Sequence, residues 1–301
     1  MGSPAVATGG VLRSLRFRNA RLFFAGLAIS NVGTWLQLTA MSLLVYHLTG
    51  EATSVGVTVA FQFLPTLLLG AWAGAIADRR DRRTLAILTQ TGLAVQAIVL
   101  GVLVLADVVT LPIVYGLSLV LGVVNAFDNP ARRGLVTELV EPAEIPNATS
   151  LNTAVMTGSR IFGPALAAML VAAIGTGWCF IANGVTFAAI IASLVAIRPS
   201  EMYPMPRRAK GGKPVREALG WVAHRRDMTI VFVNLIVVST FAFNYNVALP
   251  KLADDNLGNE DLFGWILAVV SIGSLTGSLL TARFRHVRIS WMVAGTAVLG
   301  L

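Results

Sequence analysis

The chain has 301 residues, of which 55% are hydrophobic and only 13% charged, and its mean hydropathy is +0.74. This apolar content is too high for a soluble globular domain and predicts a chain that crosses a membrane several times. The formal net charge of +8 would suggest a nucleic-acid partner in a soluble protein. In a membrane chain the basic residues are first of all topology signals, so we expect the lipid bilayer and no nucleic acid as a partner.

Apolar runs of about 20 residues, long enough to span a bilayer, predict the transmembrane helices. Eight such runs follow one another: Leu22 to Tyr46, Val55 to Ala77, Leu85 to Leu105, Val109 to Phe127, Leu151 to Ile174, Trp178 to Ile197, Ile230 to Leu249 and Leu262 to Ala282. A ninth begins at Ile289 and reaches the last residue, Leu301. We therefore predict an all-α polytopic membrane protein of about nine helices, the last of them cut short.

The basic residues fall on alternate loops. If the N-terminus lies inside, all but two of the 23 Lys and Arg residues, Arg160 and Lys251, lie on inner segments, while the outer loops carry mainly acidic residues. Because Lys and Arg concentrate on the cytoplasmic side of membrane proteins, this pattern predicts a multi-pass protein of the cell membrane with a cytoplasmic N-terminus.

The longest predicted inner segment, Arg198 to Asp227, separates six predicted helices from the rest. Within it Val215, Leu219 and Val222 recur at helical spacing beside Trp221, a pattern typical of a helix that lies on the membrane surface. We predict an N-terminal six-helix bundle (residues 1–197), a cytoplasmic basic linker with an amphipathic helix (198–228) and a partial C-terminal bundle (229–301).

The stretch from Gly74 to Arg83 joins the second and third predicted helices. Its last six residues hold four arginines and two aspartates, which cannot lie in hydrocarbon, although a generic cytoplasmic loop would meet that requirement too. The stretch resembles the signature Gly-x-x-x-Asp-Arg/Lys-x-Gly-Arg-Arg/Lys between helices 2 and 3 of the major facilitator superfamily of secondary transporters. The matching residues are Gly74, Asp78, Arg79, Arg82 and Arg83, and Asp81 replaces the second glycine.

This resemblance implies a fold of two six-helix halves, related as parallel repeats about an axis along the membrane normal. A trace of the repeat is Gly70 and Gly74 in the second predicted helix, matched by Gly273 and Gly277 in the eighth. The resemblance also implies that Gly74 allows helices to approach closely and that Asp78 lies near a helix N-terminus and an arginine. Because the superfamily has twelve helices, we expect that the chain is truncated and that these residues alone transport poorly.

Two further stretches, Asn125 to Val140 and Asn147 to Asn152, are similar to the branch that contains the enterobactin exporter and related multidrug exporters. The fifth predicted helix also resembles the antiporter packing motif, with Ser159, Gly163 and Pro164 at motif positions. The resemblance implies a transporter that exports a small hydrophobic or siderophore-like molecule by alternating access, driven by a proton gradient.

Polar residues inside the predicted spans are candidates for substrate contact. Arg160 is the one arginine inside a span and is expected to attract an anionic group, or alternatively to reach toward the inner face or to pair with Asp128. The uncharged candidates are Asn31, Gln37, Gln62, Asn152 and Asn244. For each of these, the alternative is an interhelical hydrogen bond. No Asp or Glu falls deep in a predicted span, so the sequence indicates no proton carrier.

Several alternatives stay open. The chain could be a non-transporting fragment or an accessory membrane protein, or an uptake transporter of the same fold. An enzyme should gather His, Asp or Glu at one membrane face, and the sequence has no such cluster, so we expect no catalytic activity. The single cysteine, Cys179, excludes a disulfide within the chain and a cysteine metal cluster. We expect no cofactor and no metal, and a monomer.

Overall fold

The computed structural model describes residues 12–205 and 220–241. The described part consists of helices and their connections and contains no strand, which confirms the predicted all-α class. The chain divides into two compact units, Met1–Gly211 and Gly212–Leu301, and each is described by itself.

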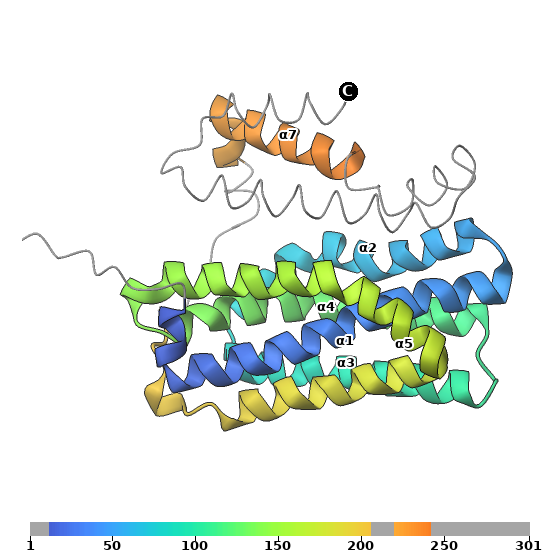
Figure 1. The fold of residues 1–301 in the computed structure, drawn as a ribbon. Coiled ribbons are helices and arrows are strands. Elements are labelled where there is room, and N and C mark those ends of the chain that lie inside the picture. The colour runs from blue at the N-terminus through green and yellow to red at the C-terminus, as the bar shows by residue number, and fades with distance from the viewer. Residues whose placement is uncertain (1–11, 206–219, 242–301) are drawn as a thin grey trace, which may run out of the picture. The chain divides into compact units, whose positions relative to one another are not determined.

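The first unit is a bundle of long helices that run alongside one another (Figure 1). Its elements are η1 (Arg13–Arg16), α1 (Arg18–Thr49), α2 (Ala52–Ala77), α3 (Arg82–Leu105), α4 (Leu111–Glu138), η2 (Pro142–Glu144), α5 (Ile145–Ala196) and η3 (Pro199–Glu201). In the described part, α1 to α4 and the segment Met169–Ala196 of α5 are long and apolar enough to cross a membrane. The helices α1, α2 and α3 enclose the apolar runs predicted from the sequence.

The element α5 contains two predicted spans rather than one. Gly175 has φ 79° and ψ 166°, which is not helical and lies in a region that favours glycine. Figure 1 shows that the chain reverses its direction in this part of α5, so that the element forms a hairpin. We call residues 145–174 the first arm and residues 176–196 the second arm. The sequence correctly predicted two helices here, because their apolar runs are separated by Gly175 and Gly177.

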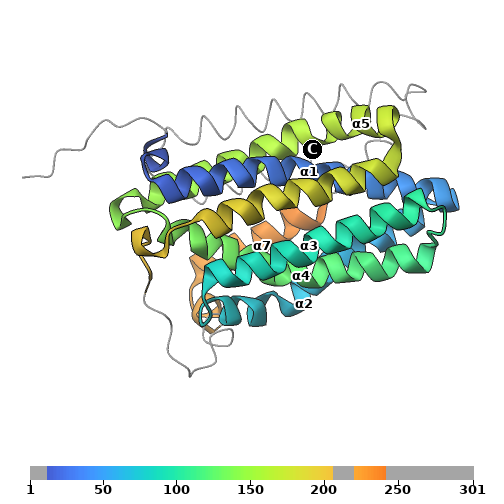
Figure 2. The same ribbon diagram turned by 90° about the horizontal axis from the view of Figure 1, so that it is seen from below.

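Four pairs of helices make most of the packing contacts within the unit. The helix α1 packs against α5, α2 packs against α4, and α3 packs against both α4 and α5. Accordingly, α4 lies between α2 and α3 (Figure 2). Two clusters of buried apolar side chains fill the interior, one centred on residues such as Phe23, Leu135 and Phe187 and the other on residues such as Met41, Leu100 and Phe180.

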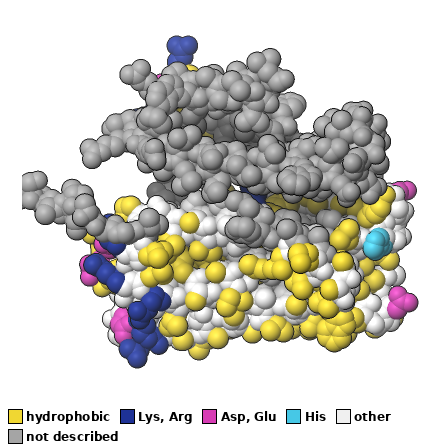
Figure 3. Space-filling view, viewed as in Figure 1, with side chains coloured by type: hydrophobic (Ala, Val, Ile, Leu, Met, Phe, Trp, Pro, Cys, Tyr) yellow, Lys and Arg dark blue, Asp and Glu magenta, His cyan; other side chains and the backbone are white. Residues whose placement is uncertain are grey.

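The surface of the first unit is apolar along its length and charged at its ends. Figure 3 shows hydrophobic side chains over the middle of the visible face and Lys and Arg side chains gathered at one end. We call this end, formed by η1, the start of α1, the loop 78–81 and the connection from α4 to α5, the basic end. Large side chains such as Leu67 and Trp72 on α2 are 79% and 68% exposed, as expected for a surface that faces lipid.

The contact between α2 and α4 depends on a proline and a glycine. Pro65 lies inside α2 and has no N–H, so the Phe61 carbonyl one turn earlier lacks its usual helical donor. Gly122 of α4 packs on this point: a Cβ there would lie 2.6 Å from the carbonyl oxygens of Phe61 and Gln62. The missing side chain therefore allows the two backbones to meet.

In the second unit the structure describes α7 (Arg226–Phe241) and the turn before it. The Arg225 guanidinium lies 4.6 Å from the centre of the Trp221 ring, at the end of the predicted amphipathic helix. The predicted helices Leu262 to Ala282 and Ile289 to Leu301 lie outside the described residues. The division into residues 1–197, 198–228 and 229–301 stays a prediction.

We expect that Gly122→Ala lowers the free energy of unfolding by about 1–3 kcal/mol, because the added methyl group meets backbone rather than a movable side chain. The measurement is the thermal unfolding of the purified protein in detergent. Gly116→Ala is the matched control on the same helix, since no atom of another described segment lies within 4 Å of its Cβ position. Equal unfolding of the two variants would contradict the close contact.

Candidate functional site

The predicted signature loop lies at the basic end, where Arg82 connects three helices. Its Nη2 donates to Asp78 Oδ1 at 3.1 Å, and its Nη1 donates to Glu138 Oε1 at 3.0 Å and to the Gly134 carbonyl at 3.2 Å. The Arg82 side chain is only 17% exposed. Because a charge-assisted hydrogen bond strengthens as water is excluded, Arg82 holds the ends of α2 and α4 to the start of α3.

Arg83, the next residue, has a different partner. Its Nε donates to the Leu194 carbonyl at 2.7 Å and its Nη2 to the Val195 carbonyl at 2.8 Å. These are carbonyls of the last turn of the second arm, which have no donor within their own helix. A cation at a helix C-terminus also favours the helix dipole. Arg83 therefore ties the start of α3 to the end of α5.

The other residues of the predicted loop are less engaged. Arg79 is exposed. Gly74 is half-buried, and no described atom lies within 4 Å of its Cβ position. The close helix approach expected of Gly74 is thus not made by the described residues and stays a prediction.

A buried carboxylate on α4, Asp128, which the sequence offered only as a possible partner of Arg160, bonds to three other side chains. Asp128 is 0% exposed and accepts hydrogen bonds from Thr89 Oγ1 and Gln90 Nε2, both at 2.8 Å, and from Arg132 Nε at 2.5 Å. Asp128 lies just beyond the predicted span Val109 to Phe127, yet within α4. The apolar run stops at Phe127 and Asn129-Pro130 is typical of a turn, whereas α4 continues to Glu138. The spacing of four between Asp128 and Arg132 is the signal that could have revealed the helix.

Three buried amides form a chain across the bundle. Asn183 Nδ2 donates to Gln37 Oε1 at 2.5 Å, Gln37 Nε2 donates to Gln96 Oε1 at 2.9 Å, and Gln96 Nε2 donates to the Leu117 carbonyl at 3.3 Å. The chain joins α5, α1, α3 and α4, and all three side chains are at most 3% exposed. Gln37 thus makes an interhelical hydrogen bond, which the sequence analysis gave as the alternative to substrate contact. A role of Gln37 in substrate contact stays a prediction.

Three other candidates come together between α1 and the first arm of α5. Asn31 is buried, and its Nδ2 donates to Met156 Sδ at 2.8 Å. Asn152 and Arg160 lie four residues before and after Met156, which places all three on one face of the helix. Both Asn152 and Arg160 are half-buried. This face of the first arm therefore carries a cation and an amide, one turn to either side of the Met156 that contacts the buried Asn31 of α1.

The remaining candidates lie elsewhere. Gln62 is buried where α2 meets α4, and its Oε1 makes no hydrogen bond within the described part of the chain. Ser159 is buried, and a Cβ at Gly163 would lie 2.7 Å from Trp35 Cγ, so this part of the packing motif sits tightly against α1. The Pro164 side chain and Asn244 lie outside what the structure describes. Among the described residues, no three His, Cys, Asp or Glu side chains are placed to hold a metal ion.

Comparison with known proteins gives one family and several relatives. A family model described as transmembrane secretion effector matches residues 10–299. The staphyloferrin A transporter of Staphylococcus aureus is 24% identical over 271 residues, which are 89% of this chain and 66% of that protein. The multidrug efflux pump Tap of Mycolicibacterium fortuitum is 27% identical over 282 residues, 86% and 65% of the two chains. Macrolide efflux protein A of Streptococcus pyogenes is 24% identical over 303 residues, 95% and 73%. The chain spans about two thirds of the length of these relatives.

We expect that Asp128→Asn lowers the free energy of unfolding by about 3 kcal/mol, because it leaves the Arg132 charge without its partner in a buried place. Thermal unfolding in detergent measures the change. The control is Asp107→Asn, since Asp107 is exposed and Asn tolerates its positive φ of 56°. Adding Arg132→Gln to this variant should recover part of the lost free energy of unfolding. If the double variant instead loses as much as the two single variants together, the pairing of Asp128 with Arg132 is contradicted.

Proposed function

Because the chain belongs to the transmembrane secretion effector family of the major facilitator superfamily, we propose that it exports a small hydrophobic or siderophore-like molecule by alternating access, driven by a proton gradient. Membership makes it a membrane transporter of the major facilitator type. The observation that carries the finer proposal is the match over residues 10–299 to a family described by secretion. Relatives named for multidrug efflux, macrolide efflux and staphyloferrin A support the direction and the substrate class.

In this proposal the basic end faces the cytoplasm. The arginine-bearing segments η1, the start of α1 and the loop 78–81 lie at this end (Figure 2), and Lys and Arg favour the cytoplasmic side of membrane proteins. The N-terminus then lies in the cytoplasm, and α1 runs from the inner to the outer surface.

Alternating access requires that a half of the protein moves as a rigid body. The first unit has the bonds that such a body needs. The amide chain of Gln37, Gln96 and Asn183 joins four helices in the interior, and Arg82 and Arg83 join helix ends at the basic end. Because these bonds connect helices far apart in sequence, shifting one helix alone would leave buried polar groups without partners, which is costly.

The substrate would meet the first unit at the face formed by Asn31, Asn152 and Arg160. An arginine away from the membrane surface is expensive to insert and marks a functional position by default. The half-buried guanidinium of Arg160 would bind an anionic group of the substrate, and the amides of Asn31 and Asn152 would supply hydrogen bonds beside it.

We expect the protein, expressed in the length that its gene encodes, to lower the accumulation of fluorescent hydrophobic drugs in cells that lack their main exporters. A protonophore should abolish the effect, and Asp78→Asn should strongly reduce it, because Asp78 is a partner of Arg82. Inverted membrane vesicles then test the direction, since an exporter accumulates substrate in them and an uptake transporter does not. Normal insertion with no movement of drugs or siderophores in either direction would rule out the proposal.

Arg160→Gln should raise the KM for an anionic substrate about tenfold or more, because it removes a charged hydrogen-bond donor. Transport of a neutral hydrophobic substrate should change little, and Arg160→Lys should retain most of the anion transport. The assay is the concentration dependence of uptake into inverted vesicles. Equal losses for anionic and neutral substrates would indicate a structural role of Arg160 instead.

A further inference from the structure

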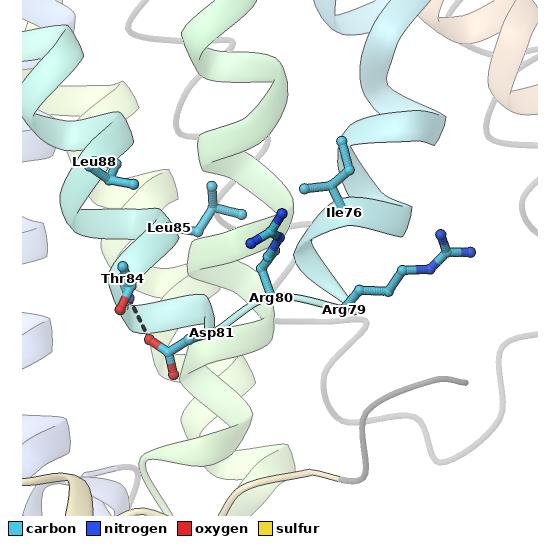
Figure 4. Close-up of a pocket in the computed structure, with 7 residues that line it drawn as sticks. All are labelled: Ile76, Arg79, Arg80, Asp81, Thr84, Leu85 and Leu88. Carbon is cyan, nitrogen blue, oxygen red and sulfur yellow. Dashed lines mark hydrogen bonds between the residues drawn. The ribbon is translucent and has the colours of Figure 1, made fainter. Parts of the chain in front are cut away.

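An open pocket of about 900 Å³ lies beside the loop 78–81 at the basic end. Figure 4 shows that one part of its lining is apolar and another charged. The apolar part comes from the end of α2 and the first turns of α3, and the charged part from the loop; the residues are Ile76, Leu85, Leu88, Arg79, Arg80 and Asp81. Leu88 is 65% exposed, so part of the apolar lining is not covered by the fold.

The two arginines of the pocket differ from their neighbours in the loop. Arg82 and Arg83 are held by carboxylates and carbonyls of other helices. Arg79 and Arg80 are exposed, and within the part of the chain that the structure describes their side chains form neither a hydrogen bond nor an ion pair. The fold thus leaves two positive charges of this loop available to a ligand.

The arginines lie where a bilayer has its headgroups. The exposed Trp72 lies on α2, and Arg79 follows it by seven residues in the loop after α2, about 10 Å at the rise of a helix. Exposed Trp side chains gather at the membrane interface. Figure 4 shows the Arg80 side chain extending from the loop toward the gap between Ile76 and Leu85, and the Arg79 side chain extending away from it. The guanidinium of Arg80 therefore stands next to the apolar lining.

Asp81 is the acidic group in the lining, and it already has a structural role. Its Oδ1 accepts a hydrogen bond from the Thr84 backbone N–H at 2.7 Å, which caps the N-terminus of α3. With two arginines and one aspartate, the pocket keeps a net positive charge. A negatively charged ligand is therefore favoured over a zwitterionic one.

We propose that this pocket binds an anionic phospholipid, with its phosphate at Arg80, where the nearby charge of Arg79 also attracts it, and an acyl chain along Ile76, Leu85 and Leu88. A soluble phosphate would use the arginines but gain nothing from the apolar side chains, whereas a lipid uses both. The inference is separate from transport, since it concerns a surface outside the face that carries Arg160. By the orientation proposed above, the lipid belongs to the cytoplasmic leaflet.

The test is native mass spectrometry of the purified full chain in detergent, titrated with phosphatidylglycerol or with phosphatidylcholine. Wild type should bind phosphatidylglycerol more tightly. Each basic residue near an anionic lipid surface is worth about a fivefold change in affinity, so Arg79→Gln/Arg80→Gln should weaken phosphatidylglycerol binding about 25-fold and leave phosphatidylcholine unchanged. The charge-conserving pair Arg79→Lys/Arg80→Lys should retain most of the preference.

The matched control is Arg21→Gln/Arg133→Gln, which removes the same charge from exposed positions on α1 and α4, outside the pocket. An equal loss of binding in this control would overturn the proposal, because it would show a diffuse charge effect. So would unchanged binding in the Arg79→Gln/Arg80→Gln variant. Thermal unfolding in the same detergent checks that each variant is folded.

The apolar side of the pocket has its own test. Leu88→Asn should weaken phosphatidylglycerol binding severalfold. Inorganic phosphate should displace no more lipid than chloride does at the same ionic strength. If phosphate displaces the lipid and Leu88→Asn has no effect, the pocket is a site for soluble anions and the lipid proposal is wrong. Because the assay reads binding only, its failure would leave the transport proposal untouched.

Discussion

Hydrocarbon offers no hydrogen bonds, and this constraint governs the whole first unit. Every backbone group that crosses a membrane must find a partner within the protein, which leaves the helix as the available form for these segments. The same requirement applies to side chains inside the bundle. Asp128 takes three donors, and the amides of Gln37, Gln96 and Asn183 bond to one another. The polar interior is therefore a set of links between helices rather than an open site.

The loop 78–81 and the residues after it show how one basic cluster serves several purposes. Arg82 and Arg83 are turned toward the bundle and join α3 to α2, α4 and the second arm of α5. Arg79 and Arg80 are exposed and line a pocket, in which Arg80 extends toward the apolar lining and Arg79 extends away from it. In sequence the four arginines are nearly adjacent and chemically identical. Which of them join helices and which stay exposed follows from where the neighbouring helices end.

The arrangement of the first unit fits a body that moves as a whole. Its interior side-chain bonds connect α1 to α5 and to α3, and α3 to α4, while the half-buried Asn152 and Arg160 lie on the first arm of α5, whose Met156 contacts α1. Such a division is what alternating access requires, because the moving half must stay rigid while one of its faces exchanges substrate with water. In the mechanism proposed above, the side that carries Asn31, Asn152 and Arg160 would be the face that meets the substrate.

The sequence by itself determined the helices of the first unit apart from the end of α4, the turn between the two arms of α5 and the family, because length, apolarity and a charged loop are local properties that a bilayer imposes on each segment. It did not determine how the polar side chains pair. Gln37 and Asn183 are 146 residues apart, and Gln90 and Asp128 are 38 apart. Which face of each helix meets which neighbour depends on rotation and crossing angle, which are set by packing of the whole bundle. For the same reason only the tertiary structure decided that Asp128 is buried, that Gln37 links helices, and that the side chains of Arg79 and Arg80 form no hydrogen bond or ion pair with the described residues.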